Sequence, residues 1–154
     1  MGKIKTKHIS RAPVEKLYSM GKQVHNHTNV LPSLKKIDIM EVSDDGKIVV
    51  AQWTAQARLI TKAYSMSWVQ KDVWDEDSMS CSFSCVDNGR GRFKYLNGYW
   101  HFAPHKSGTE MTMDVDFEID HPLMTPMVSK LIDGIMKKNN ESLLKELSKI
   151  AEKD

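Results

Sequence analysis

The stretch from residue 91 to residue 104, GRFKYLNGYWHFAP, carries the pattern that decides the fold. Its aromatic residues change phase, since Phe93 and Tyr95 are odd-numbered whereas Trp100 and Phe102 are even-numbered. The Asn-Gly pair at 97–98 would ordinarily indicate a hairpin turn, but a hairpin here leaves two very short arms whose apolar positions do not match. One β-bulge at 97–98 would instead place all four aromatic side chains on one face. The stretch therefore predicts one continuous strand over residues 92–103.

Segments with a two-residue period flank this strand on both sides. Residues 78–85 alternate serine with apolar residues, and residues 111–119 have one apolar and one acidic face. Further strands are expected over 3–9, 37–42, 48–57 and 61–74, with turns such as Asp44-Asp45-Gly46 between them. The sequence therefore predicts seven strands.

Three other segments carry helical signals. Ser10 supplies a capping side chain and Pro13 a first-turn proline for a helix after the first strand. Residues 30–34 can hold a second, very short helix, and a long helix is expected from about residue 123 to about residue 151. This order predicts an α+β fold with helices on one face of a curved antiparallel sheet. Because one long helix cannot cover both ends of such a sheet, a cavity is expected between them.

The composition is that of an ordinary globular domain. The length of 154 residues fits one domain over residues 1–154. Lys+Arg 22 against Asp+Glu 20 leaves a net charge of +2, which argues against a nucleic-acid partner. No apolar run reaches the ~18–20 residues of a membrane span, and the first residues hold no hydrophobic signal core. We therefore expect a soluble, cytoplasmic protein.

The two cysteines and the six histidines do not suggest a metal site or a cofactor. Cys81 and Cys85 would lie roughly 13 Å apart on one strand, farther than a disulfide allows, so we expect two core thiols in a reducing compartment. A metal site needs three or four convergent ligands, and no such group is visible. His101 is out of phase with its aromatic neighbours and should face solvent. No phosphate loop or serine elbow is present, and we expect no catalytic residue, metal or cofactor.

The order of elements resembles the helix-grip fold of START-like proteins, the superfamily of birch-pollen-type allergens, polyketide cyclases and lipid carriers. Residues 91–104 are similar to the G-P-F-x-x-L-x-x-x-W-x-F-x-P run of the coenzyme Q-binding and ribosome-association-toxin branch of the polyketide cyclase/dehydrase family. Residues 116–118 match the D-F-E strand of that branch, and Leu31-Pro32 lies where the family has a Leu-Pro or aromatic-Pro pair. Arg92 replaces the usual proline, and residues 25–28 lack the usual Asp-Val-Glu-x-Tyr pattern.

The resemblance implies that the first and last strands pair antiparallel. Lys3, Lys5 and Lys7 would then lie opposite Asp114, Asp116 and Glu118. Opposite charges across two strands contribute ~0.2–1 kcal/mol each and fix the register. We therefore assign these lysines a structural role in preference to a contact with anionic lipid or RNA.

The methionine and tryptophan content favours a ligand cavity, because methionine packs adaptably against flexible apolar molecules, although an ordinary core would use the same side chains. Arg58 ends a neutral strand and could hold a ligand carbonyl or carboxylate, although a solvated turn arginine is the slightly better interpretation. Gln52, Gln56, Tyr64 and Tyr95 are the other polar candidates. The residues expected to contact the ligand are Trp53, Arg58, Tyr64, Met66, Trp68, Phe83, Tyr95, Trp100, Met111, Met113, Val115, Met127, Leu131 and Ile135.

The sequence leaves three functions open. The first is binding of a small hydrophobic molecule (a quinone, isoprenoid, polyketide or lipid), with a peripheral membrane contact for ligand pickup. The second is an aromatase/cyclase-type enzyme, which would need at least two titratable side chains facing each other in the pocket. The third is a ribosome-associated or protein-interaction module, which would need a coherent basic surface. Of these, few inward-facing titratable groups and the low net charge favour the first; the oligomeric state is left open.

Overall fold

A computed structural model describes residues 2–23, 34–59, 62–86, 93–119 and 125–153, and gives the backbone alone for residues 57–59 and 62–64. The described elements are β1 (Gly2–Ser10), α1 (Val14–Lys22), β2 (Leu34–Val42), β3 (Ile48–Leu59), β4 (Lys62–Asp75), β5 (Ser80–Cys85), β6 (Phe93–His105), β7 (Gly108–Ile119) and α2 (Pro126–Glu152).

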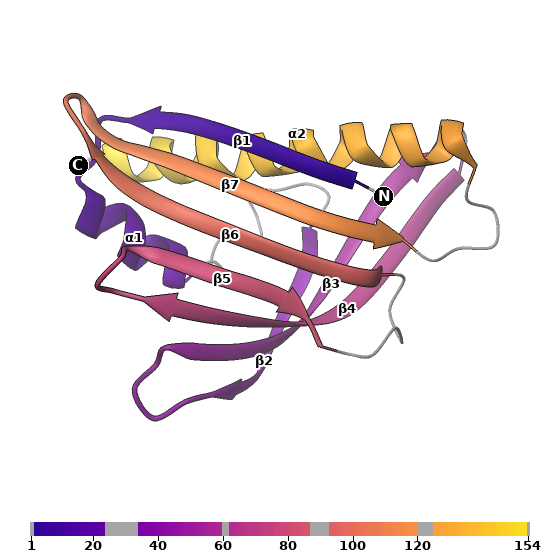
Figure 1. The fold of residues 1–154 in the computed structure, drawn as a ribbon, viewed down its shortest axis with the longest axis horizontal. Helices are drawn as coiled ribbons and strands as arrows, with labels where there is room; N and C mark the ends of the chain where they lie inside the picture. The colour runs from indigo at the N-terminus through magenta and orange to yellow at the C-terminus, as the bar shows by residue number, and fades with distance from the viewer. Residues whose placement is uncertain (1, 24–33, 60–61, 87–92, 120–124, 154) are drawn as a thin grey trace.

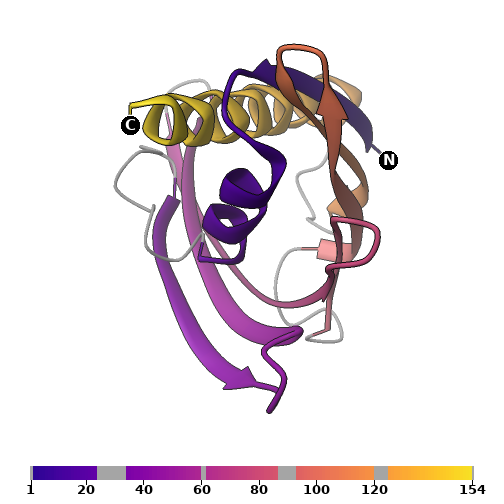
Figure 2. The ribbon, with the colours of Figure 1, turned by 90° about the vertical axis from the view of Figure 1, so that its left-hand side faces the viewer.

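The strands form one antiparallel seven-stranded sheet in the order β1-β7-β6-β5-β4-β3-β2. The sheet curves around the two helices, with α2 lying across its open side and α1 within the curve (Figures 1 and 2). This confirms the expected α+β helix-grip architecture. A second short helix was expected over residues 30–34. Leu34 is instead the first residue of β2, and residues 30–33 lie outside the described part of the chain.

Two turns show why strands end where they do. Gly46 has φ +74° in the turn between β2 and β3, a left-handed conformation that glycine adopts without strain. Met79 also has a positive φ, of 49°, in the turn after β4. Because a left-handed residue cannot continue a strand, β5 begins at Ser80 and not at residue 78 as expected.

Strand β6 is continuous, as predicted, but its bulge lies elsewhere. The register with β7 shifts between Phe93 and Tyr95, and from Leu96 onward it is regular. The bulge therefore places Tyr95 on the outer face. The Phe83 ring packs so closely on the backbone of residue 98 that only glycine fits there, because a Cβ would lie 2.0 Å from the ring. The Asn-Gly pair thus marks neither a turn nor a bulge but a place where a neighbouring ring covers the strand.

The pairing of β1 with β7 confirms part of the expected charge ladder. Lys3 lies opposite Asp116 and Lys5 opposite Asp114, whereas Lys7 lies opposite Thr112. Glu118 falls beyond the end of β1, because Gly2 is already paired with Phe117. The Glu118 carboxylate instead forms an ion pair with Lys94 of β6, at 3.4 Å.

Helix α1 closes one end of the curved sheet. Its Leu17 is fully buried, and the Tyr18 ring makes edge-on contacts with Trp74 and Phe102, with ring centroids 5.4 and 5.8 Å away. Gly21 lets the helix approach this cluster, since a Cβ would lie 3.0 Å from the Phe102 ring. The aromatic residues of β4 and β6 therefore form a packed wall at this end.

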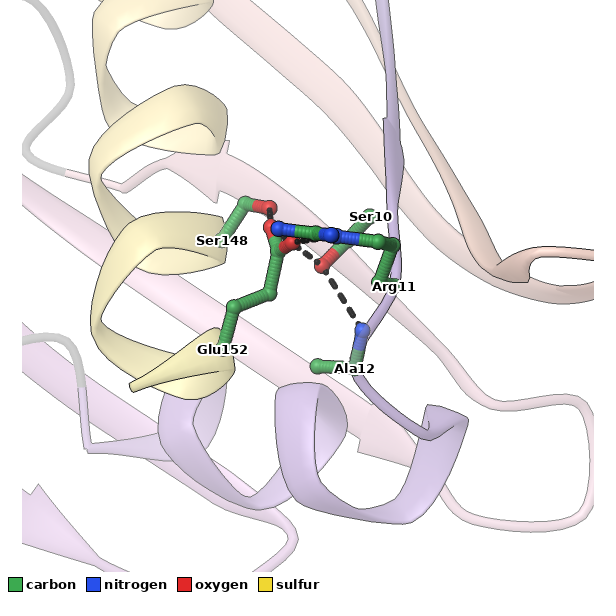
Figure 3. Close-up of polar contacts among 5 residues, drawn as sticks. All are labelled: Ser10, Arg11, Ala12, Ser148 and Glu152. Carbon is green, nitrogen blue, oxygen red and sulfur yellow. Dashed lines mark hydrogen bonds and ion pairs between the residues drawn. The ribbon is translucent and has the colours of Figure 1, made fainter. Parts of the chain in front are cut away.

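A polar clasp joins the end of α2 to the connection between β1 and α1 (Figure 3). Arg11 Nε lies 2.8 Å from Glu152 Oε1, and the hydroxyls of Ser10 and Ser148 donate to Glu152 Oε2. Ser10 was expected to cap α1, but its Oγ accepts from the Ala12 backbone N–H, and the N-cap residue is Pro13. The hydrogen bond from Ser148 and the contact with Arg11 lower the pKa of Glu152 to about 2.

Candidate functional site

A cavity of about 200 Å³ lies between the concave face of the sheet and α2. Its wall is mainly aromatic and aliphatic, and the sheet and the helix both contribute to it. The lining residues are Leu34, Trp53, Ala55, Gln56, Met66, Trp68, Gln70, Asp72, Trp74, Cys81, Phe83, Phe93, Leu96, Trp100, Met113, Val115, Ile119, Ile132, Ile135, Met136, Asn139, Asn140 and Leu143.

The alternation of β4 produces one complete side of this wall. Every second residue from Met66 to Trp74 lines the cavity, because successive side chains of a strand point to opposite faces. Two of these inward residues, Gln70 and Asp72, are polar and only 7% exposed. A polar pair is thus inserted into an otherwise apolar row.

A chain of hydrogen bonds runs along β4 inside the cavity. Trp68 Nε1 donates to Gln70 Oε1 at 3.0 Å, and Gln70 Nε2 donates to Asp72 Oδ1 at 2.9 Å. The indole fixes which end of the Gln70 amide faces Asp72, since the carbonyl oxygen is taken by the Trp68 N–H. Gln70 therefore presents a donor to the Asp72 carboxylate.

Burial raises the pKa of Asp72 to about 6, and the hydrogen bond from Gln70 offsets part of this effect. The nearest other titratable group in the described lining is Cys81, on the neighbouring strand. Burial, together with the Asp72 charge, raises the pKa of the Cys81 thiol well above its usual value, so this cysteine is neutral. Asp72 is the one charged side chain in the described lining.

Three buried nitrogen donors of the wall have no hydrogen-bond partner among the described residues. They are the indole Nε1 atoms of Trp53 and Trp100 and the amide Nδ2 of Asn140. A buried donor without a partner carries a desolvation cost of about 1–3 kcal/mol. The cavity wall therefore holds donors that the described residues leave without a partner.

Eight of the residues expected to contact a ligand line the cavity together: Trp53, Met66, Trp68, Phe83, Trp100, Met113, Val115 and Ile135. Gln56 also lines it, whereas Gln52 is exposed and donates to Ser67 Oγ at 2.8 Å. The side chains of Arg58 and Tyr64 lie outside the described part of the structure.

Four expected residues lie elsewhere in the structure. Met111 is fully buried in the core beside the cavity and is not part of its lining. Tyr95 lies on the outer face, where burial and the charges of Asp116 and Glu118 raise its pKa. Met127 and Leu131 are 63% and 41% exposed, because the apolar stripe of α2 is wider than the surface that covers it.

Four polar members of the lining, two on β4 and two on α2, were missed by the sequence reasoning, which had named only Gln56. Gln70 and Asp72 are even-numbered, like Trp68 and Trp74 on the same strand, so alternation alone places them on the inner face. Asn139 and Asn140 follow Ile132 and Met136 at helical spacing. Polar residues at positions that continue the apolar face of a strand or helix are the sequence signal that could have identified these four side chains.

Within the described ranges, no group of three or more histidine, cysteine or acidic residues is arranged to hold a metal ion. No helix in the described part of the chain is long and apolar enough to cross a membrane.

Solved structures with the same fold cover nearly the whole chain. A Thermus thermophilus protein, TTHA0849, is 23% identical, with a TM-score of 0.83 over 97% of this chain and 96% of that one. The Zhui aromatase/cyclase from Streptomyces sp. R1128 is 13% identical, with a TM-score of 0.82 over 97% and 93%. A START superfamily protein from Mycobacterium smegmatis is 16% identical, with a TM-score of 0.73 over 97% and 99%.

A search of curated proteins gave no match. The family model described as "Polyketide cyclase / dehydrase and lipid transport" matches residues 10–144, which include most of the cavity wall and of the sheet. On this match, together with its START-like fold, the chain belongs to the polyketide cyclase/dehydrase and lipid transport family.

Proposed function

We propose that this protein binds a small hydrophobic molecule, of the quinone, isoprenoid, polyketide or lipid class, in the cavity between the sheet and α2. The observation that carries the proposal is the cavity itself, an apolar space of about 200 Å³ lined by four tryptophans and two phenylalanines among other apolar residues. Removing apolar area from water contributes about 25 cal/mol per Å². A ligand that fills this space therefore gains affinity mainly by desolvation.

The size of the cavity limits the part of the ligand that it encloses. A dry cavity of ~150 Å³ in another protein accepts benzene, so a space of about 200 Å³ matches one or two fused rings or a short branched chain. A longer molecule would have to leave part of its chain outside. Family membership supports the same assignment, because the family description names both cyclases and lipid transport.

One observation favours a second candidate, an aromatase/cyclase-type enzyme. Asp72 is a buried carboxyl group in the cavity with a pKa of about 6, close to the value at which a group can both give and take a proton. The Zhui protein, which shares the fold, is an aromatase/cyclase. In this alternative, replacing Asp72 with asparagine abolishes conversion of a poly-β-ketone substrate while its binding persists.

The test is native mass spectrometry of freshly purified protein, followed by denaturing extraction of the bound molecule. Ile135 lines the cavity, so Ile135→Trp fills it; Lys138→Trp on the exposed side of α2 is the matched control. We expect an apolar adduct on the wild type and on the control, and its loss from Ile135→Trp. An empty wild-type protein whose melting temperature responds to no quinone, lipid or polyketide would refute binding of these classes of ligand.

A further inference from the structure

The Asp72 carboxylate lies in the cavity without a cationic partner among the described residues. Its side chain is more than nine-tenths buried, and the bond that reaches it comes from the neutral amide of Gln70. The described lining contains no lysine, arginine or histidine. A carboxylate taken out of water without a counter-charge is costly, so the site gains free energy when a cation reaches it.

Arg58 lies too far along the sheet to pair with this carboxylate. Arg58 pairs with Ala63 in the sheet, and Ala63 precedes Asp72 by nine positions on β4. At ~3.3 Å per residue that separation is roughly 30 Å along the strand, farther than an arginine side chain spans. Arg58 therefore does not supply the counter-charge.

Aromatic residues flank the carboxylate on its own strand and on the next one. Phe83 of β5 is the cross-strand neighbour of Asp72, and Trp74 follows two residues later on the same face of β4. Trp68 lies at the other end of the hydrogen-bonded chain. A buried carboxylate in a cavity lined by aromatic residues is an environment that suits an organic cation, because aromatic rings attract positive charge as well.

We infer that the ligand of this cavity is an apolar amine, whose protonated nitrogen pairs with the Asp72 carboxylate while its rings or chain fill the apolar space. The inference rests on the proposed function, since it assigns a chemical class to the ligand of the same site. Among small hydrophobic molecules it favours those that carry a basic nitrogen over a pure hydrocarbon, which offers no donor to Asp72.

Asp72 is the titratable group of the described lining whose charge changes near neutral pH. Cys81 on β5 is a neutral thiol, and Asn139 and Asn140 of α2 are neutral amides. Gln70 on β4 does not titrate. Affinity for an amine should therefore rise as Asp72 loses its proton, and affinity for a neutral molecule should not.

The experiment compares two probes of equal size, 1-naphthylmethylamine and its neutral isostere 1-ethylnaphthalene, by isothermal titration calorimetry at about pH 7.5. The amine should bind at least ~10-fold more tightly to the wild type. Asp72→Asn should remove that difference and leave the affinity for 1-ethylnaphthalene within ~3-fold, whereas Asp44→Asn, which removes an exposed carboxylate, should change neither.

Each other outcome overturns the inference in a distinguishable way. Equal affinity for both probes, or amine binding that survives Asp72→Asn, refutes the amine assignment while the hydrophobic site stands. Neutral 1-naphthol binding as tightly as the amine would show that the site selects a hydrogen-bond donor and not a cation. If neither probe binds, the proposed function fails as well. Should Asp72→Asn not fold, wild-type titrations from pH 5 to pH 7 decide, because amine affinity that does not increase over this range also refutes the inference.

Discussion

Replacing Asp72 with asparagine should stabilise the ligand-free protein at neutral pH. Burial raises the pKa of Asp72 from an ordinary value of 3.8 to about 6, a change of about two units. One unit corresponds to 1.36 kcal/mol, so the ionised carboxylate costs the folded state roughly 3 kcal/mol at pH 7. Asparagine keeps an oxygen that can accept from Gln70 and removes the charge.

The sign of the pH dependence follows from the direction of the shift. Between about pH 4 and pH 6 the folded protein retains the Asp72 proton while the unfolded chain has lost it, so the free energy of unfolding falls as the pH rises through this window. Asp72→Asn removes this contribution. The difference in unfolding free energy, variant minus wild type, should therefore increase by roughly 3 kcal/mol from pH 4 to pH 7.

Urea unfolding at half-unit pH intervals measures this difference directly. Asp44→Asn in the exposed turn between β2 and β3 controls for the change in net charge. A pH-independent difference added to the expected pH-dependent one would reflect altered packing and would leave the argument intact. Curves that run parallel across the whole window would refute the argument, because they would mean that Asp72 does not hold its proton more tightly in the folded state.

Three further changes test other parts of the structure. Glu152→Gln should lower the unfolding free energy by about 1 kcal/mol at neutral pH. Because the folded pKa of Glu152 is depressed to about 2, this contribution should fade as the pH drops from about 4.5 towards 2. Acid unfolding curves of the variant that match those of the wild type would contradict this. Gly98→Ala should push the Phe83 ring into the cavity, destabilise the protein by ~1–3 kcal/mol and weaken probe binding, with partial rescue by Phe83→Leu; unchanged affinity would argue against this displacement. Trp100→Phe should cost less stability than Trp68→Phe. The Trp100 indole N–H has no partner among the described residues, whereas that of Trp68 donates a hydrogen bond to Gln70. Denaturant midpoints in the opposite order would show that these bonds are assigned wrongly.

Periodicity predicted the strands well because each strand buries one face. The alternation of residues 111–119 appears directly as buried Met111, Met113, Val115 and Phe117 in β7. The resemblance also gave the partner of β1, and the observed register places Lys3 and Lys5 opposite acidic residues. The buried faces follow from the local alternation of residues, and the strand pairing follows from the order of elements along the chain. Both can be read from the sequence.

Features that depend on contacts between distant segments were predicted less well. Whether Gly98 marks a bulge or a close approach depends on Phe83, a residue of another strand, so the sequence around residue 98 cannot distinguish the two. Serine is a favoured residue at helix N-caps, yet the Ser10 hydroxyl donates to Glu152 from the other end of the chain. Met127 and Leu131 continue an apolar stripe, but the described residues leave them exposed.

The sequence by itself determined the α+β class, the strand order along the chain, the long last helix and eight residues of the apolar wall, since hydrophobic periodicity is a local property. Only the tertiary structure showed that Trp68, Gln70 and Asp72 form a hydrogen-bonded row facing a cavity, and that the described wall holds no counter-charge for the carboxylate. The physical reason is that desolvation and pairing depend on what the other strands and α2 bring to the site, and the residues that enclose Asp72 come from many separate parts of the chain.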